Sequence, residues 1–193
     1  MARWLKEPEA GPRKPLSTVV TFLEMSANPK RQVPAPHGVR VALMRAERPT
    51  VVFYRFLFDA VGRNWVWISR RFWSDQELTR VIHDPGVEIT ILYVAGVPAG
   101  YFELDRRVPG AVELSFFGLM PEFIGLSLGR FLLNAAIDAA WQGETQRLWV
   151  HTCDLDHPRA LGVYQKAGFV AVRQELETLK DPRLVGLPWP EGR

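Results

Sequence analysis

The chain has one cysteine, Cys153, so it cannot form a disulfide within itself. Disulfide-free chains are typical of reducing compartments, which favours a cytoplasmic location. The sequence also lacks an apolar run of the roughly 20 residues that a membrane helix needs, and its first residues lack the apolar core of a signal peptide. We therefore expect a cytoplasmic protein with no membrane partner.

The chain also has little net charge, only +3 over 193 residues. Residues 1–15 hold four basic side chains against two acidic ones, so most of the surplus lies in a proline-containing tail. A patch that binds nucleic acid needs clustered basic residues on a folded face, and we expect no nucleic-acid partner. No cluster of histidine, cysteine or carboxylate residues has the spacing of metal ligands, so no metal is expected either.

The composition is that of a globular protein, with 47% hydrophobic and 23% charged residues. A chain of 193 residues is long enough to bury a core and short enough to form one domain. We expect a flexible basic tail at 1–15, a single domain at 16–180 and a C-terminal tail at 181–193.

Local patterns predict a regular alternation of strands and helices. Strands are indicated by β-branched residues and alternation, and helices by apolar spacing, caps and terminal glycines. The expected strands are 17–25, 39–43, 88–95, 100–107, 112–120, 147–152 and 169–178. The expected helices are 50–62, 74–83, one that opens near 127 or 128 and ends before Gly143, and 158–166.

Two connections shape the expected fold. Residues 96–98 join 88–95 to 100–107 in a hairpin, and the next turn leads into 112–120, which gives an antiparallel meander. Strand 147–152 is reached through a helix and is therefore expected to lie parallel to 112–120. The fold class is α/β (α+β), with a mixed, mostly antiparallel central sheet flanked by helices.

The strand at 112–120 leads through a turn containing Gly125 into a long helix. The first amides of a helix have no partner within it, and the helix dipole makes that end positive. Such a turn suits an anion such as a phosphate. A glycine used only for packing is the other interpretation.

Two segments resemble the GNAT superfamily of acetyl-CoA-dependent N-acetyltransferases. Segment 159–169 matches the family pattern A-x-x-x-Y-x-x-x-G-F, with Ala160, Tyr164, Gly168 and Phe169 in register. The turn before the long helix stands where the family has Q/R-x-x-G-x-G/A. Aligned on Gly129, the sequence departs from that pattern. Ile124 takes the Q/R position and Ser127 the first glycine.

The resemblance covers about 88–178 and implies acetyl-CoA as co-substrate. It also implies that the two parallel strands splay apart, and the break in alternation at 116–118 is where a bulge could force this. Backbone amides, rather than side chains, would bind most of the pyrophosphate. The residues implied to contact coenzyme A are Phe117, Gly118, Leu119, Ile124, Gly125, Leu126, Ser127, Leu128, Gly129, Arg130, His157 and Ala160.

Acetyl transfer to an amine needs a base for the amine and an acid for the departing thiolate. Tyr164 matches the position of the family's general acid, and the alternative is a tyrosine that packs under the sheet. Glu113 is the first choice for the base, with Glu103 and His151 in reserve. A surface glutamate and a structural histidine are the plainer interpretations of Glu113 and His151.

The acceptor is expected near the aromatic stretch 64–73. Trp65, Trp67 and Trp73 could hold a cationic amine or an aromatic acceptor, and Arg70 and Arg71 could take a carboxylate. Glu103, on the strand at 100–107, is also expected to contact the acceptor. These tryptophans could instead anchor a loop to the core or to a dimer partner.

The sequence thus predicts an N-acetyltransferase that acts on a primary amine of a small molecule or peptide by direct attack in a ternary complex. The alternative is a catalytically inactive CoA-binding or protein-interaction domain of the same fold. The sequence is compatible with both a monomer and a homodimer.

Overall fold

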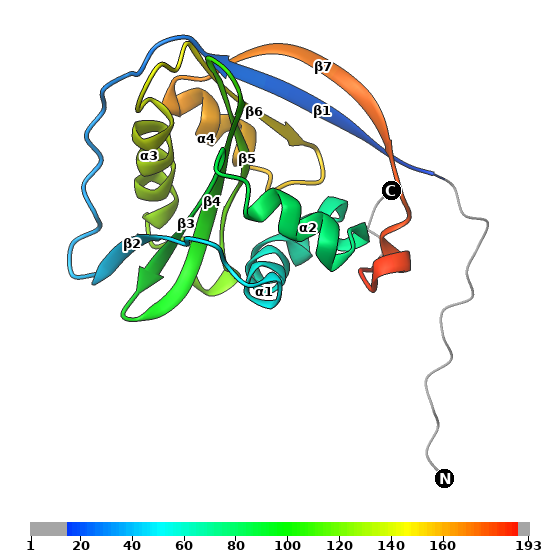
Figure 1. Ribbon diagram of the computed structural model, residues 1–193. Helices are drawn as coiled ribbons and strands as arrows, with labels where there is room; N and C mark the ends of the chain where they lie inside the picture. Colours follow the sequence, from blue (N-terminus) through cyan, green and yellow to red (C-terminus); the bar gives the residue numbers. More distant parts are fainter. Residues whose placement is uncertain (1–14, 189–193) are drawn as a thin grey trace.

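The computed structural model describes residues 15–188. Except for Pro15, the expected tail at 1–15 lies outside these residues. Seven strands form one sheet with the order β2-β3-β4-β5-β6-β1-β7 (Figure 1). The strands are β1 (Leu16–Met25), β2 (Val41–Arg45), β3 (Val87–Val94), β4 (Val97–Val108), β5 (Ala111–Leu119), β6 (Arg147–Cys153) and β7 (Val170–Leu179).

Four α-helices pack on this sheet. They are α1 (Val51–Gly62), α2 (Asp75–Ile82), α3 (Leu128–Ala140) and α4 (Ala160–Ala167). Short 3-10 turns connect the elements: η1 (Arg63–Trp65), η2 (Ser69–Phe72), η3 (Pro121–Phe123) and η4 (Pro182–Val185). None of the helices in residues 15–188 is long and apolar enough to cross a membrane.

The helix ends follow from local chemistry. The Thr50 hydroxyl accepts the amide of Phe53 at 3.2 Å and begins α1. Ser74 and Glu77 form the reciprocal capping box that begins α2. Gly168 ends α4 at a φ of 111°, a conformation that glycine adopts without steric cost.

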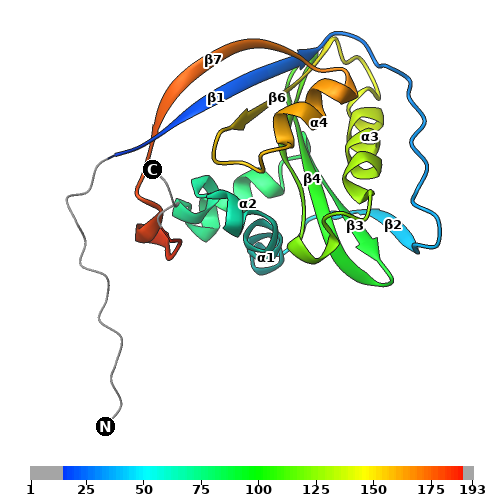
Figure 2. The same ribbon diagram turned by 180° about the vertical axis from the view of Figure 1, so that it is seen from behind.

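The helices cover both faces of the sheet, which therefore has two apolar cores. In Figures 1 and 2, α1 and α2 lie on one face, and α3 and α4 on the other. Successive residues of β4 point to opposite faces of the sheet and so pack in different cores. Tyr101 packs with α1 and α2, whereas Phe102 packs with α3 and α4. This alternation fixes the register of the strands, because a slip of one residue would exchange the two faces.

The sheet is mixed and mostly antiparallel, as predicted. Its parallel pair is β5 with β6, and the ladders that join the other neighbours are antiparallel. The position of β1 was not predicted. This strand lies between β6 and β7, so that the two ends of the fold pair with each other.

Two local features differ from expectation. The β3–β4 hairpin turns at Ala95 and Gly96, both with positive φ, rather than at 96–98. A two-residue turn of this kind matches the twist of the strands, and Pro98 is already part of β4. The bulge in β5 lies at Ser115, just before the expected 116–118, where β5 has one residue more than β4.

The expected tail at 181–193 is described as far as Pro188. Pro182–Val185 forms η4, and Leu187 is only 4% exposed. The Lys180 ammonium lies 4.6 Å from the centre of the Phe72 ring, so the segment after β7 contacts η2.

Candidate active site

The sheet opens between β5 and β6. Their parallel ladder holds only from Ala111 opposite Arg147 to Glu113 opposite Trp149. Beyond that point β5 continues along β4 as far as Leu119, while β6 continues along β1. The bulge at Ser115 bends β5 where the ladder ends. The splayed pair that the family resemblance implied is therefore present.

The opening leaves backbone groups of a central strand without a strand partner on one side. Residues Phe117, Gly118 and Leu119 are accordingly only half-buried, although they belong to the middle of the sheet. Buried amides and carbonyls without partners are costly, so a strand in this state suits a ligand that can hydrogen-bond to it.

The start of α3 lies at the end of this open strand. The β-carbon position of Gly129 is 3.7 Å from a methyl group of Leu119, so the first turn of α3 packs on the last residue of β5. Gly125 has a φ of 91° and Ser127 a φ of 60°. Ser127 makes no side-chain cap, which leaves the first amides of α3 to other partners. Leu126 and Arg130 are exposed, and Ile124 is half-buried.

Tyr164 of α4 reaches the same open strand. Its ring centre is 6.0 Å from that of Phe117 on β5, and the residue is 6% exposed. Burial, and then the negative charge of Asp156, raise the pKa of the Tyr164 phenol well above its usual range. The phenol therefore keeps its proton at neutral pH.

Glu113 and His151 meet where the strands part. The Nδ1 atom of His151 lies 3.5 Å from Oε1 of Glu113. The contact with Glu113 raises the pKa of His151 above its ordinary value, against the opposing effect of burial. The His151 side chain is 45% exposed and that of Glu113 is 22% exposed, so solutes can reach the pair.

The pair lies on the face that α1 and α2 cover. Glu113 stands opposite Asp105, which shares its face with Glu103, and Glu103 bonds to α1. On this face the rings of Phe22 and Trp149 adjoin His151, with ring centres 5.9 and 6.1 Å away. The start of α3 and the His151 pair thus lie on opposite faces and meet at the opening in the sheet.

The predicted aromatic segment contacts the loop after β6. The Trp67 indole donates to Asp156 Oδ1 at 3.2 Å, and Asp156 Oδ2 accepts from Thr152 and from the amide of Cys153. The Trp65 ring lies 4.9 Å from that of His157.

Trp67 and His157 also make contacts that stabilise the fold around them. Trp67 packs against Phe116, with ring centres 5.2 Å apart. His157 Nδ1 accepts the amide of Arg159, directly before Ala160 begins α4.

Glu103 and Arg70 pair inside the core and are not exposed to an acceptor. Glu103 is 0% exposed, and its two carboxylate oxygens accept from Arg70 at 2.8 Å and from the Tyr54 hydroxyl at 2.6 Å. The Arg70 guanidinium stacks 4.1 Å from the Trp73 ring. Burial raises the pKa of the Glu103 carboxyl, and Arg70 and Tyr54 oppose that rise.

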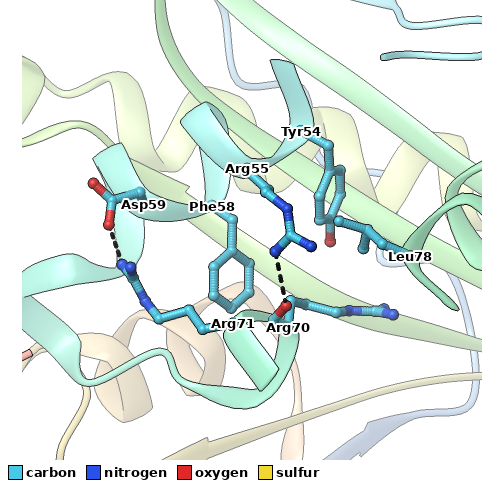
Figure 3. Close-up of a pocket in the computed structure, with 7 residues that line it drawn as sticks. All are labelled: Tyr54, Arg55, Phe58, Asp59, Arg70, Arg71 and Leu78. Carbon is cyan, nitrogen blue, oxygen red and sulfur yellow. Dashed lines mark hydrogen bonds and ion pairs between the residues drawn. The ribbon is translucent and has the colours of Figure 1, made fainter. Parts of the chain in front are cut away.

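Beside this network lies a cavity of about 220 Å³ between α1 and the η2 segment (Figure 3). Its lining residues are Tyr54, Arg55, Phe58, Asp59, Arg70, Arg71 and Leu78. Arg71 binds Asp59 and the carbonyl of Trp67, and Arg55 binds Asp75 and the carbonyl of Trp73. The charged side chains that line the cavity therefore bind other groups of the same chain. The cavity is separate from the opening in the sheet.

The structure thus pairs Glu113 with His151 where the strands part, places Tyr164 against Phe117 of the open strand, and places Glu103 and Arg70 in the core. Sequence reasoning missed Asp156, Phe22 and Trp149. Only a knowledge of strand pairing could have found Phe22, because it reaches the site through β1. Among residues 15–188, no three histidine, cysteine or carboxylate side chains are grouped to hold a metal ion.

A known protein family matches more than half of this chain. The model of the acetyltransferase (GNAT) family matches residues 54–169. A search of curated proteins finds no significant match.

Similar solved structures include the GCN5-related N-acetyltransferase from Sphaerobacter thermophilus, with 12% identity, a TM-score of 0.58 and coverage of 86% of this chain and 52% of that one. A putative GNAT acetyltransferase from Novosphingobium aromaticivorans has 17% identity and a TM-score of 0.55 over 89% of this chain and 69% of that one. The ribosomal-protein-S18-alanine N-acetyltransferase from Escherichia coli has 17% identity and a TM-score of 0.55 over 69% of this chain and 80% of that one. At these identities the likeness is one of fold. The chain spans about half the length of the Sphaerobacter protein.

The buried ion pair generates a stability prediction. Glu103→Gln should lower the free energy of unfolding by about 3 kcal/mol, because it leaves the Arg70 cation buried without a counter-charge. The matched control is Glu88→Gln, which removes a partly exposed partner of Arg106 and should cost less than about 1 kcal/mol. Urea unfolding at neutral pH measures both. Equal small losses would contradict the structural role of Glu103.

Proposed function

The chain belongs to the GNAT acetyltransferase family, and from this premise we propose that it transfers the acetyl group of acetyl-CoA to a primary amine. The acceptor is a small molecule or peptide, and the amine attacks directly within a ternary complex. The observation that carries the proposal is the short β5–β6 ladder, which ends at Glu113 opposite Trp149 and opens the sheet beside the start of α3. The opening lets a group held on one face meet a group held on the other.

The residues around the start of α3 fit coenzyme A. The uncapped first amides of α3 and the turn at Gly125 suit a pyrophosphate, and the half-buried Phe117–Leu119 segment suits the pantetheine arm. Bound acetyl-CoA supplies the acetyl group as an activated thioester. Ser127 adopts the left-handed conformation at the position where the family has glycine, at a cost of about 1 kcal/mol. Glycine would adopt the same conformation without this cost.

We assign removal of the amine proton to the Glu113–His151 pair. His151 is the more exposed member, and its neutral imidazole can accept a proton. Glu113 holds the ring through Nδ1 and stabilises the imidazolium that forms. Phe22 and Trp149 offer aromatic faces for the body of the acceptor. Trp67, Arg70 and Glu103 are packed within the wall beside this position and would shape it rather than bind the amine.

We assign Tyr164 as the acid that gives a proton to the departing thiolate. Its raised pKa keeps the phenol protonated until a stronger base forms beside it. The chain's one cysteine is a poor candidate for a covalent route, because burial raises the pKa of the Cys153 thiol and keeps it protonated. This supports direct attack.

Binding and turnover test the proposal separately. Calorimetric titration with acetyl-CoA should show binding that Ser127→Val weakens by about tenfold, because a β-branched residue is strongly disfavoured at positive φ. Ser127→Gly, the matched control, should bind at least as tightly as the wild type. A thiol-release assay over a panel of amines then measures transfer. Binding without release for any amine identifies the inactive CoA-binding alternative, and absence of both contradicts the proposal.

The Glu113–His151 pair predicts a specific pH dependence. Below its pKa His151 already carries a proton and cannot accept another, so kcat/KM should fall as the pH drops through that raised pKa. Glu113→Gln removes the carboxylate, returns the His151 pKa towards about 6.5 and moves this acid limb to lower pH. The plateau rate should fall as well, because the ring loses its partner.

Proton loss from the acceptor amine affects both enzymes equally, so the difference between their profiles isolates His151. NMR titration of His151, assigned with His151→Gln, checks the pKa without turnover. Identical acid limbs and identical titrations would remove the pair from the mechanism.

Tyr164→Phe keeps the ring that packs on Phe117 and removes the proton donor. Turnover should fall on the order of a hundredfold, while the acetyl-CoA dissociation constant and the unfolding midpoint stay close to wild type. Thiol-release kinetics with saturating acetyl-CoA measure the effect. Wild-type turnover in a folded Tyr164→Phe protein would exclude the acid role.

A further inference from the structure

The strand β7 forms one edge of the sheet. Within residues 15–188 it pairs with β1 on one side and with no strand on the other. Residues 170–178 are all exposed. Figures 1 and 2 show β7 arching along the outside of the sheet with β1 beneath it. A long edge strand is a template for pairing with another chain.

The edge has charges and one bulge but lacks two other common protections against such pairing. Edge strands are commonly blunted by lysine or proline, and β7 contains neither. It also carries exposed apolar side chains: Val170 is 66% exposed, Val172 51% and Leu176 74%. The ladder with β1 has a bulge at Val172, so the faces alternate regularly only from Arg173 onward. From there Arg173, Glu175 and Glu177 share one face, and Gln174 and Leu176 share the other.

The centre of β7 is complementary to itself when it is read in the opposite direction. An antiparallel pairing about a two-fold axis through Gln174 places residues equally far from Gln174 opposite each other. Val172 then faces Leu176 of a second copy, and Arg173 faces the second copy's Glu175. At these two positions on each side of the axis, apolar meets apolar and cation meets anion. The next pair places Ala171 opposite Glu177.

The other edge of the sheet lacks this property. β2 is only five residues long, Val-Ala-Leu-Met-Arg, and carries a single charge, Arg45. Pairing β2 with itself therefore brings no opposite charges together. Pairing β2 with β7 of another copy would be head-to-tail and would not close into a dimer.

We propose that β7 pairs antiparallel with β7 of a second copy, about a two-fold axis at Gln174, so that one sheet runs through both copies. The proposal does not rest on the acetyltransferase activity. The pairing borders the face where the amine is expected, because the Arg173 guanidinium lies 3.7 Å from the centre of the Phe22 ring, and Phe22 adjoins His151. The second copy's Glu175 would hold Arg173 in that position.

Charge exchange between copies tests the pairing. Sedimentation analysis at increasing concentration should show a wild-type dimer. Arg173→Glu alone, or Glu175→Arg alone, sets like charges opposite each other twice per dimer and should raise the dimer dissociation constant about tenfold to a hundredfold. A 1:1 mixture of the two single variants should restore the dimer, because both contacts between copies then join opposite charges.

The mixture separates this effect from changes within one chain. Arg173 and Glu175 also pair within the same chain, and that contact stays repulsive in each single variant. The double variant should dimerise as the wild type does. Circular dichroism checks folding, and Leu176→Glu, which sets a carboxylate against Val172 of the second copy, replaces any single variant that fails to fold.

Met44→Glu on the other edge, where Met44 is 60% exposed, is the matched control and should leave the dimer unchanged. A wild-type protein that stays monomeric overturns the proposal. So does a dimer that resists the charge changes, or one that Met44→Glu dissociates.

Discussion

The end of the β5–β6 ladder is the constraint on which the rest of the site depends. After Glu113 and Trp149, the two strands follow different neighbours, and the bulge at Ser115 bends β5 towards β4. A central strand normally satisfies its amides and carbonyls on both sides. Separating β5 from β6 removes the hydrogen bonds between these two strands and connects the two faces of the sheet. The proposed transfer between groups held on opposite faces uses this opening.

The parts of the chain that border the opening must be held rigidly. One of them, the segment between α1 and α2, contains neither an α-helix nor a strand. The segment between α1 and α2 consists of short turns and is held by the Glu103–Arg70 pair and by the Trp67–Asp156 bond. Burying an ion pair costs desolvation energy that its attraction only partly offsets. Here the pair fixes a loop that packing alone would hold weakly, and the hydrogen bond from Trp67 to Asp156 joins that loop to the loop after β6.

Sequence reasoning succeeded where the signals are local. Thr50, Ser74 and Gly168 mark helix ends through contacts within a few residues, and the order of strands and helices followed from them. It failed where distant residues decide. The burial of Glu103 depends on Arg70, 33 positions away in the chain, and no local pattern links them. The hairpin turn was misplaced because Ala95, rather than proline, accepts the positive φ that the tight turn needs. The place of β1 depends on pairing with residues more than a hundred positions later.

That same strand connects the opening in the sheet with its exposed edge. β1 hydrogen-bonds to β6 from Met25 to Val20, so β6 is held on the side away from β5 and does not need β5 beyond Trp149. β6 therefore stays in the sheet after it separates from β5. Because β1 occupies the position next to β6, β7 is displaced one strand further out, where residues 170–178 stay exposed. The strand that holds β6 beside the opening thus also places β7 at the edge of the sheet.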